Sequence, residues 1–429
     1  MSTEHSKRAA KFTADVEKTT WHDATFWSVR QKRDKMAHEL PEWEDLRELA
    51  SEIKMHTITH LADYLDVFSK NLESRGVKVH WAKDAQEFNE IVLGILNDHH
   101  VKKMVKSKSM LTEECEMNPY LEKHGIDVVE TDLGERIIQL LGQKPSHIVM
   151  PAIHLKREEV GKMFEEKGIS KEIGNYDPTY LTRCARHHLR DQFMEAGAGM
   201  TGCNFGVAEM GDCVVCTNEG NADMTTSMPK LHIVAMGIEK LVPDYKSLAV
   251  FQRLLCRCGT GQPTTAFTSH FRQARPGAEM HVVLVDNGRS DILADKDHWQ
   301  TLKCMRCGAC MNTCPVYRRS GGYSYTYFIP GPVGVNLGML KNPQKYADNV
   351  SACTLCLSCD NVCPSKVGPG SQIYVWRQSL DKLGKADPIK KAMSSGMEYL
   401  FDRPSLYTTA LKFAPLANLI PECCTHFSN

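Results

Sequence analysis

Apolar residues recur every three or four positions over much of the first seventy residues. In the segment 43–71, leucine and isoleucine keep this spacing and few residues interrupt it. The spacing is the repeat of one face of an α-helix. The pattern predicts a helical N-terminal region, residues 1–72, that packs against another part of the protein.

Beyond Gly76 the pattern changes to short, β-rich apolar runs separated by helix-like stretches. The predicted strands are residues 77–81, 101–105, 126–129, 147–150, 205–208, 213–217, 231–236 and 281–285. Residues 85–97 and 156–167 carry a helical pattern. Strands that alternate with helices are typical of a parallel sheet with helices on its faces. Residues 73–295 are therefore predicted to form an α/β domain.

The composition is that of a soluble globular protein, with 42% hydrophobic and 24% charged residues in a chain of 429. Lysine plus arginine equal aspartate plus glutamate at 52 each, which removes the electrostatic argument for a nucleic-acid partner. No apolar run is long enough to cross a bilayer, and the first residues lack the apolar core of a secretory signal. We therefore expect a cytoplasmic protein with no transmembrane segment, whose 17 cysteines lie in a reducing compartment.

Two cysteine runs share the spacing C-x2-C-x2-C-x3-C-P. The first holds Cys304, Cys307, Cys310 and Cys314, and the second holds Cys353, Cys356, Cys359 and Cys363. Thiolates are soft anionic ligands that suit iron, and in this spacing three cysteines bind one [4Fe–4S] cluster while the fourth reaches the neighbouring cluster. The predicted ligand sets are Cys304, Cys307 and Cys310 with Cys363, and Cys353, Cys356 and Cys359 with Cys314. Zinc sites use C-x2-C pairs separated by a longer loop, so the duplicated run favours two iron–sulfur clusters.

The segment between the two runs, 315–352, is longer than in small bacterial ferredoxins. Residues 343–350 and 374–383 are compatible with helices. We therefore predict an α-helical ferredoxin module over residues 296–385. The remaining C-terminal tail, 386–429, carries no strong signal.

Candidate binding residues lie where predicted strands end. Lys106, Ser107 and Lys108 follow the strand 101–105, and sheets of this kind bind ligands beyond the carboxyl ends of their strands. The lysines could hold a carboxylate or a phosphate, and a solvated charged loop explains them equally well. Asn218 and Gly220, in a turn-rich segment after another strand, are further candidates for binding.

Four residues are candidates for catalysis. Glu209 and Glu219 lie in loops beside predicted strands, where either carboxylate could act as a base, although loop glutamates are more often only exposed. His270 and Arg272 share one side of their segment if it is extended. Arginine could then bind the carboxylate of a 2-hydroxy acid while histidine takes its hydroxyl proton. A structural histidine beside a surface arginine is the simpler interpretation of this pair.

The remaining cysteines give a weaker metal signal. Cys213 and Cys216 are three apart in a predicted strand and so point to opposite faces, which favours buried apolar roles. Cys256 and Cys258 could share a face, which leaves a third metal centre open. The adjacent pair at 423–424 has poor geometry for a shared metal and stays unassigned.

Several longer strings carry a resemblance to a known family. They are KSKSMLTEE at 106–114, DVVETDLGERIIQL at 127–140, PSHIVMPAIH at 145–154, NFGVAEMGDCVVCTNEGN at 204–221, HVVLVDNGRSDIL at 281–293 and YFIPGPVGVNL at 327–337. With the cysteine runs, they make the chain similar to the lactate utilization protein B family, the iron–sulfur subunit of a three-component L-lactate oxidation system. The resemblance implies a central domain with the sugar-phosphate isomerase and CoA-transferase fold, in which a glutamate can serve as nucleophile. It also implies two [4Fe–4S] clusters and two partners, a cysteine-rich subunit and a smaller subunit that shares the central domain.

The expected function is electron transfer in an oxidoreductase complex that converts L-lactate to pyruvate. Clusters pass one electron at a time, and two of them can accept both electrons of a hydroxy acid in sequence. No G-x-G-x-x-G follows a predicted strand, so a Rossmann-type flavin or nicotinamide site is not evident. The alternative is a general electron relay that resembles heterodisulfide-reductase systems and uses the α/β domain as a docking scaffold. Partners could also hold the protein at the inner face of the membrane.

Overall fold

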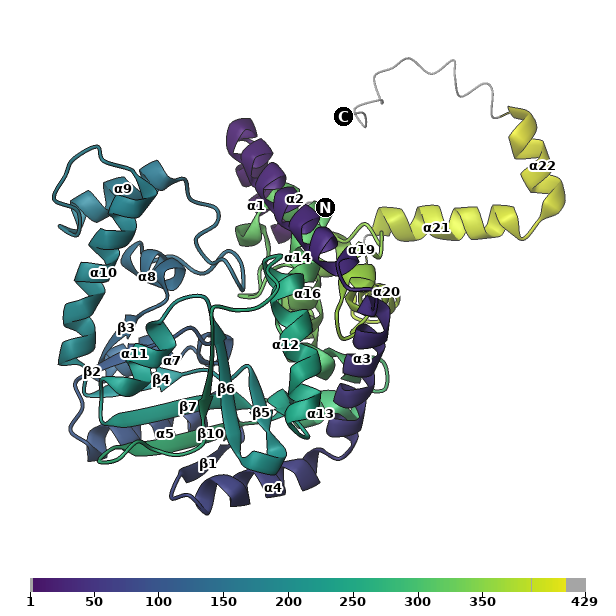
Figure 1. Cartoon of the computed structure of the whole chain (residues 1–429). Coiled ribbons are helices and arrows are strands. Elements are labelled where there is room, and N and C mark those ends of the chain that lie inside the picture. The colour runs from purple at the N-terminus through teal and green to yellow at the C-terminus, as the bar shows by residue number, and fades with distance from the viewer. Residues whose placement is uncertain (1–2, 387, 414–429) are drawn as a thin grey trace. The chain divides into compact units, whose positions relative to one another are not determined.

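The computed structural model describes residues 3–386 and 388–413 (Figure 1). The chain divides into a large unit, Ser2–Arg377, and a second unit that begins at Gln378. All the predicted binding, catalytic and cluster-ligating residues lie in the large unit.

A six-stranded parallel sheet forms the centre of the large unit. Its strand order is β1-β10-β7-β4-β2-β3, and every pairing within it is parallel. The strands are β1 (Lys78–Ala82), β2 (Lys103–Lys106), β3 (Asp127–Glu130), β4 (Ala198–Thr201), β7 (Leu231–Gly237) and β10 (Glu279–Val285). The predicted α/β architecture with a parallel central sheet is confirmed.

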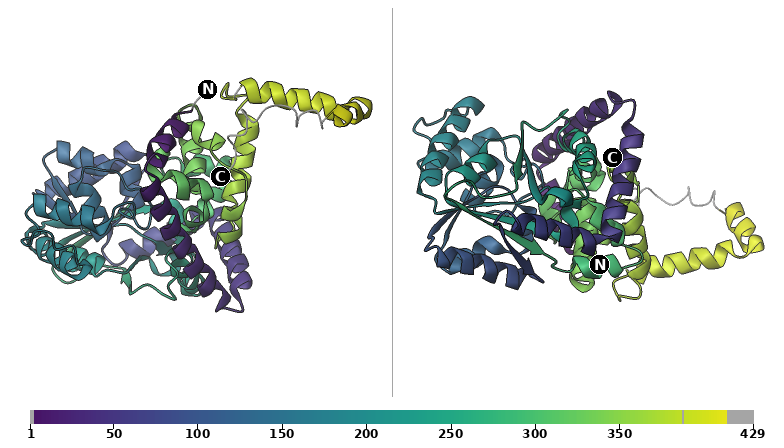
Figure 2. Two further views of the ribbon diagram at one scale, coloured as in Figure 1. Left: turned by 90° about the horizontal axis from the view of Figure 1, so that it is seen from above. Right: turned by 60° about the horizontal axis from the view of Figure 1, so that its bottom comes forward.

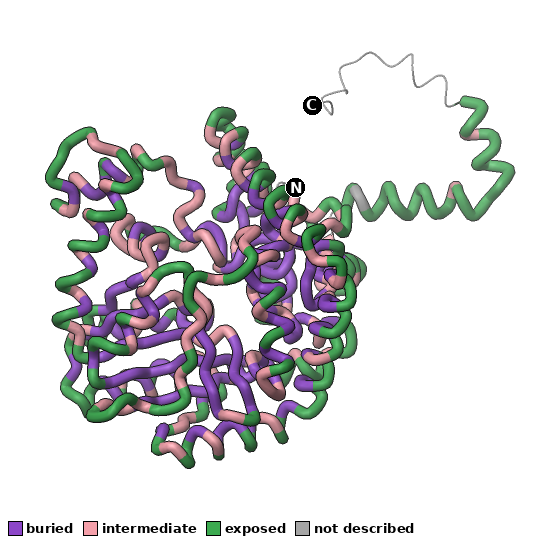
Figure 3. The backbone as a smooth tube through the Cα atoms, viewed as in Figure 1, coloured by how far each residue is buried: buried purple, intermediate pink, exposed green. Residues whose placement is uncertain are grey.

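Both faces of this sheet are covered, which explains its nearly continuous apolar strands. In β10, Val283 and Val285 pack in one core with α5 (Ala85–Asp98), while Val282 and Leu284 pack in another core with α4 (Leu61–Glu73). Successive side chains of a strand point to opposite faces, so each strand contributes to two cores. Figure 3 shows these strands as largely buried.

A second, smaller sheet has the order β8-β5-β6-β9. Its strands are β5 (Phe205–Val207), β6 (Asp212–Thr217), β8 (Leu241–Val242) and β9 (Phe267–Phe271). Gly211 turns the chain between β5 and β6 with a φ of 56°, a left-handed conformation that glycine adopts without strain. The helix α12 (Tyr245–Gly259) packs Phe251 against Phe205 of this sheet.

The remaining helices of the α/β region connect the strands of the large sheet or line its ends. They are α6 (Met110–Glu114), α7 (Met117–Lys123), α8 (Leu133–Leu140), α9 (Arg157–Glu166), α10 (Pro178–Glu195), α11 (Asn221–Ser227) and α13 (Arg289–Ala294).

The cysteine-rich region is helical, as the long segment between its runs predicted. Its helices are α14 (Ala309–Thr313), α15 (Pro315–Ser320), α16 (Gly331–Lys341), α17 (Pro343–Tyr346), α18 (Asp348–Ser351), α19 (Ser358–Val362) and α20 (Pro369–Ser379).

Three N-terminal helices precede α4, and the predicted helical start of the chain is confirmed. They are α1 (Glu4–Thr13), α2 (Val16–His38) and α3 (Trp43–Thr59). α2 packs against α14 and α15 and so lies along the cysteine-rich region, whereas α3 packs against α12 of the α/β domain (Figure 2).

The structure differs from the sequence analysis at one predicted strand, residues 147–150, and at three strands that were not predicted, β4, β8 and β9. Residues 147–150 form a loop and not the predicted strand, because the buried His147 ring accepts hydrogen bonds from the backbone N–H groups of Val149 and Met150 at 3.0 Å and bends the chain. The strand β4 was not predicted because its sequence, AGMT, lacks a β-rich pattern. Its Gly199 is required by packing, since a Cβ there would lie 1.8 Å from the carbonyl oxygen of Thr225.

The second unit contains α21 (Pro388–Phe401) and α22 (Pro404–Phe413), where no strong signal was expected. Large apolar side chains such as Met393 and Phe413 are exposed on these helices. No helix in the described part of the chain is long and apolar enough to cross a membrane. The cysteine pair at 423–424 lies outside the described residues.

Candidate functional site

The two cysteine runs fold in the same way. In each run, the residue before the second cysteine and the residue after it have left-handed backbones. These are Arg306 (φ 61°) and Gly308 (φ 81°) in the first run, and Leu355 (φ 55°) and Leu357 (φ 56°) in the second. Left-handed leucines are costly and persist where the surrounding structure requires them.

The structure brings the last cysteine of each run to the first three cysteines of the other. Burial, and then the neighbouring Cys304 and Cys363, raise the pKa of the Cys310 thiol. Burial raises the pKa of Cys314 to about 11, with further contributions from Cys353 and Cys356. The short helices α14 and α19, which precede these last cysteines, lie against each other. A hydrogen bond of 2.6 Å joins the hydroxyls of Thr313 and Ser358 between them.

Backbone N–H groups point at the sulfurs in both runs. The Sγ of Cys304 accepts from the N–H of Arg306 at 3.4 Å, and the Sγ of Cys353 accepts from Leu355 at 3.3 Å. The last cysteines have the same kind of donor, Tyr317 for Cys314 at 3.5 Å and Val367 for Cys363 at 3.3 Å. Such N–H groups stabilise thiolates that ligate iron.

A small cavity lies at the first crossed set of cysteines. Cys304, Cys307, Cys310 and Cys363 all line it, together with apolar residues that include Ile148 and Val333. Four soft sulfur donors around one cavity, with N–H groups aimed at the sulfurs, fit a cubane cluster. The two sets differ in exposure, because Cys307 and Cys363 are buried whereas Cys356 is exposed.

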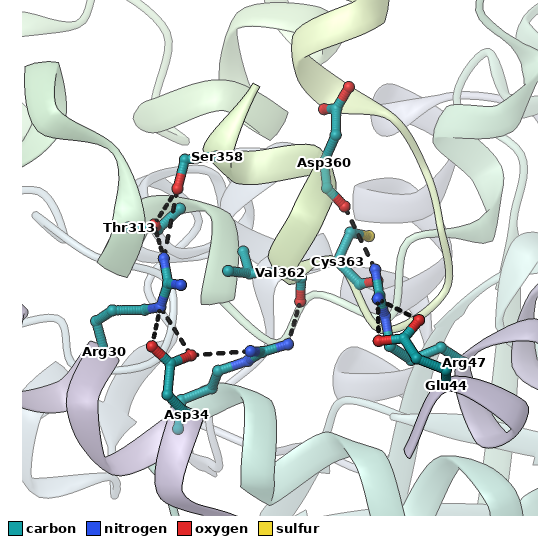
Figure 4. Close-up of polar contacts among 10 residues, drawn as sticks. Arg30, Asp34, Glu44, Arg47, Thr313, Ser358, Asp360, Val362 and Cys363 are labelled. Atoms are coloured by element: carbon teal, nitrogen blue, oxygen red, sulfur yellow. Dashed lines mark hydrogen bonds and ion pairs between the residues drawn. The ribbon is translucent and has the colours of Figure 1, made fainter. Parts of the chain in front are cut away.

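Arginines from the N-terminal helices hold both runs (Figure 4). Arg30 of α2 donates to the hydroxyls of Thr313 and Ser358. Arg47 of α3 donates from Nε to the carbonyl oxygen of Cys363 at 3.0 Å. Both arginines are also paired with carboxylates, Arg30 with Asp34 at 2.8 Å and Arg47 with Glu44 at 2.7 Å, so they hold the runs through hydrogen bonds rather than through net charge. The N-terminal helices therefore belong to the cluster site as much as to the fold.

A pocket of about 320 Å3 lies beyond the carboxyl ends of β2, β4 and β7. One of its walls is the loop 305–307, which carries Cys307 of the first cysteine set. Of the residues proposed from the sequence, Lys108, Asn218 and Glu219 line this pocket. The pocket therefore brings part of the predicted binding site of the α/β domain to the cysteine-rich region.

Glu219 lies at the rim of the pocket and accepts a hydrogen bond from the N–H of Leu133 at 3.1 Å. Partial removal from solvent and the nearby Asp132 raise the pKa of Glu219 to about 7. A carboxylate with a pKa near neutrality suits a general base.

The other predicted binding residues lie outside the pocket lining. Lys106 is buried and forms an ion pair with Glu130 at 2.7 Å. Burial would lower the pKa of Lys106, but Glu130 and Glu113 raise it, so this lysine is fully charged and already paired. Ser107 is buried beside it, and Gly220 precedes α11 without lining the pocket.

Three of the four catalytic candidates are also outside the pocket lining. Glu209 is exposed and accepts a hydrogen bond from the N–H of Tyr245. His270 does lie on a strand, β9, and contacts Asp212 at 2.6 Å. Arg272 follows the strand and is exposed. Their catalytic roles stay predictions.

The extra cysteines are divided between the cores and the pocket. Cys213 packs in the core around α4, and Cys216 packs on the opposite side of β6, so the two faces expected for this pair are observed. Cys216 and Cys256 line the pocket with Cys203, whereas Cys258 is fully buried.

A buried ion-pair network that was not predicted from the sequence underlies the pocket. Arg289 binds both carboxylate oxygens of Glu114 at 3.0 Å and one of Glu239 at 2.5 Å. Burial alone would raise the pKa of Glu239, but Arg289 and other cations lower it to about 2. Lys240 and Arg306 also line the pocket. Arg289 and Glu114 lie in two different strings that the sequence singled out, whereas Glu239 lies in neither, so the pairing depends on segments that are distant in the sequence.

The fold and the site define an iron–sulfur protein in which a parallel α/β domain is joined to a ferredoxin-like module. Residues 65–290 match the LUD domain family, and residues 300–367 match the 4Fe-4S dicluster domain family.

Curated relatives match almost the whole chain. Lactate utilization protein B from Oceanobacillus iheyensis is 40% identical over 90% of this chain and 82% of the relative. The proteins of the same name from Bacillus cytotoxicus and Macrococcus caseolyticus are 41% and 42% identical over 90% of this chain and 82% of each relative. The chain belongs to the lactate utilization protein B family. A solved structure of a DUF162 family protein from Deinococcus radiodurans is 13% identical over 52% of this chain and 98% of its own, with a TM-score of 0.30, which is too low to support an argument.

Proposed function

We propose that this protein is the iron–sulfur electron-transfer subunit of a complex that oxidises L-lactate to pyruvate. The observation that carries the proposal is the shared loop 305–307, which forms one wall of the α/β pocket and also lines the cavity of the first cysteine set. A small molecule in this pocket lies against the residues that hold that set. The names of the curated relatives supply the substrate.

The ligands of the two clusters are the crossed sets. Cys304, Cys307, Cys310 and Cys363 would hold the first cluster, and Cys353, Cys356, Cys359 and Cys314 the second. Bound clusters supply one-electron transfer, so two of them suffice for the electron pair of a hydroxy acid. The buried Cys307 of the first set lines the pocket, and Cys356 of the second set is exposed to solvent. A redox partner would therefore dock on the surface around Cys356.

Within the pocket, Glu219 is the candidate base for the hydroxyl proton of the substrate. Its pKa of about 7 allows it to accept a proton near neutral pH and to release it again. Lys108 and Asn218 line the same pocket, which supports their predicted role in binding.

The proposed partners are a cysteine-rich subunit and a smaller lactate-utilization subunit, in a cytoplasmic complex that these partners could hold at the membrane. The competing function is a general electron relay in which the α/β domain only docks partners. The pocket favours the first function, because a docking scaffold needs no cavity beside the cysteine loop.

The test uses the anaerobically purified protein mixed with both partner subunits. We expect L-lactate to reduce the clusters of this chain, observed by electron paramagnetic resonance, and D-lactate to have little effect. When the complex contains a Cys307→Ala chain, L-lactate should no longer reduce the clusters of that chain. Pyruvate formation at the wild-type rate by a complex whose chain lacks both cysteine sets would overturn the proposal.

A further inference from the structure

Two cationic side chains line the pocket without a partner. Lys240, at the end of η2 (Ile238–Lys240), and Arg306, between the first two cysteines, have no side-chain hydrogen bond or ion pair within the described residues 3–386 and 388–413. Nη1 of Arg306 is shielded from solvent and still unbonded. Both lie close enough to Cys304 to interact with it electrostatically. Unpaired cations away from water are costly, so such groups are expected to meet an anion.

The carboxylates of the pocket are bonded to protein groups, except that Oε1 of Glu239 has no hydrogen-bond partner in the described chain. Glu114 and Glu239 bind Arg289, and Glu219 accepts the N–H of Leu133. Asp132 accepts the N–H of Glu135 at the start of α8 at 3.1 Å. Lys240 and Arg306 are therefore the two cations of the inner pocket that no described side chain bonds, and Glu239 is close enough to interact with both electrostatically.

Lys108 adds less to this charge. Its Nζ donates to the carbonyl oxygen of Val149 at 2.7 Å, and it lies 3.9 Å from Glu135. Lys240 and Arg306 are therefore the cations available to a ligand on the side of the cysteine loop.

The pocket also offers an unused acceptor. Asn221, at the start of α11, lines the pocket with only 7% of its surface exposed. Its Oδ1 is shielded from solvent and has no hydrogen-bond partner in the described chain. A buried amide oxygen without a partner fits a ligand that donates a hydrogen bond, such as a hydroxyl.

We propose that this pocket binds a small 2-hydroxy carboxylate, with its carboxylate between Lys240 and Arg306 and its hydroxyl toward Asn221. The volume of about 320 Å3 is more than sufficient for a ligand of this size. The inference deepens the proposed function and rests on it for the choice of L-lactate as the probe. It places the carboxylate beside the loop of the first cysteine set.

Equilibrium binding of L-lactate to the anaerobically purified full chain tests this site. We expect Lys240→Gln and Arg306→Gln to weaken binding at least about tenfold, because each removes a charge-assisted hydrogen bond. Lys240→Arg keeps the charge and should bind within a few fold of wild type. Lys246→Gln is the matched control, since Lys246 is exposed on α12 and does not line the pocket. The iron content of each variant is measured. The affinity of Arg306→Gln is compared with that of the wild type only for protein that holds the wild-type amount of iron.

Two analogues separate the contacts. Lactamide, which lacks the carboxylate charge, should bind at least about tenfold more weakly than L-lactate, and propionate, which lacks the hydroxyl, should also bind more weakly. Wild-type affinity in both Lys240→Gln and Arg306→Gln, or equal binding of lactamide, would overturn the carboxylate site. Equal binding of propionate would overturn the Asn221 contact.

The outcomes also distinguish this inference from the proposed function. If L-lactate binding depends on Lys240 but L-lactate leaves the clusters of the complex oxidised, the result supports the site and contradicts the proposed function. Lactate-dependent reduction at the wild-type rate with Lys240→Gln and Arg306→Gln chains supports the function and contradicts the site.

Discussion

The Cys363→Ala variant should lose the cluster of the first cysteine run, although Cys363 belongs to the second run. The Cys363 thiol lies beside Cys304 and Cys310 and lines the same cavity. Without a fourth sulfur ligand that cluster is not held intact, so we expect the variant to lose about four iron atoms per chain. Quantitation of iron and sulfide together with electron paramagnetic resonance measures this loss.

The identity of the lost cluster is read by comparison with single variants of each set. The spectrum of Cys363→Ala should match that of Cys307→Ala and differ from that of Cys356→Ala. Cys258→Ala is the control, because this buried thiol neighbours Cys307 and yet lies outside both runs. It should keep the wild-type iron content. A Cys363→Ala spectrum equal to that of Cys356→Ala would show that each run binds its own cluster.

The Arg289→Met variant should lose about 3–5 kcal/mol of unfolding free energy. Its side chain is 6% exposed and pairs with Glu239, which is 3% exposed, and with Glu114. Removing the arginine leaves these carboxylates buried without their cation. Denaturant unfolding measures the change, and Arg272→Met, which removes an exposed arginine, should change stability by less than about 0.5 kcal/mol. Equal stability of the two variants would contradict the importance of the network.

The same network gives the stability a defined pH dependence. The pKa of Glu239 falls from 4.5 to about 2 on folding, since Arg289 outweighs the effect of burial. Its contribution is therefore complete above pH 4.5 and is lost as the pH falls toward 2. The difference in stability between wild type and Glu239→Gln should be largest near neutral pH and shrink over this interval. A difference that stays constant down to pH 2 would contradict the low pKa.

The sequence was sufficient where a pattern is local. The repeated cysteine spacing alone predicts the crossed sets. In the structure, Cys363 lies close to Cys304, as that spacing implies. The alternation of strands and helices was sufficient to predict the parallel sheet. Strand β4 was missed because the Thr225 carbonyl packs directly against Gly199, so this position needs glycine and the strand lacks the residues typical of β-strands.

The charge pattern of the site depends on which strands become neighbours. Lys106 lies at the end of a strand, where ligand sites are expected. The register of β2 and β3 places it opposite Glu130, and the ion pair between them leaves Lys106 unavailable to a ligand. Conversely, Lys240 lies far in the sequence from Arg306, and only the folded chain brings the two cations to one pocket. Sequence patterns contain no information on this pairing.

Anaerobic purification of the wild-type protein, followed by iron and sulfide quantitation and spectroscopy of the reduced state, tests the central claim most directly. We predict about eight iron atoms and about eight sulfides per chain, and two clusters whose signals show magnetic interaction. A protein that holds only zinc, or that is colourless and free of metal, would contradict the account.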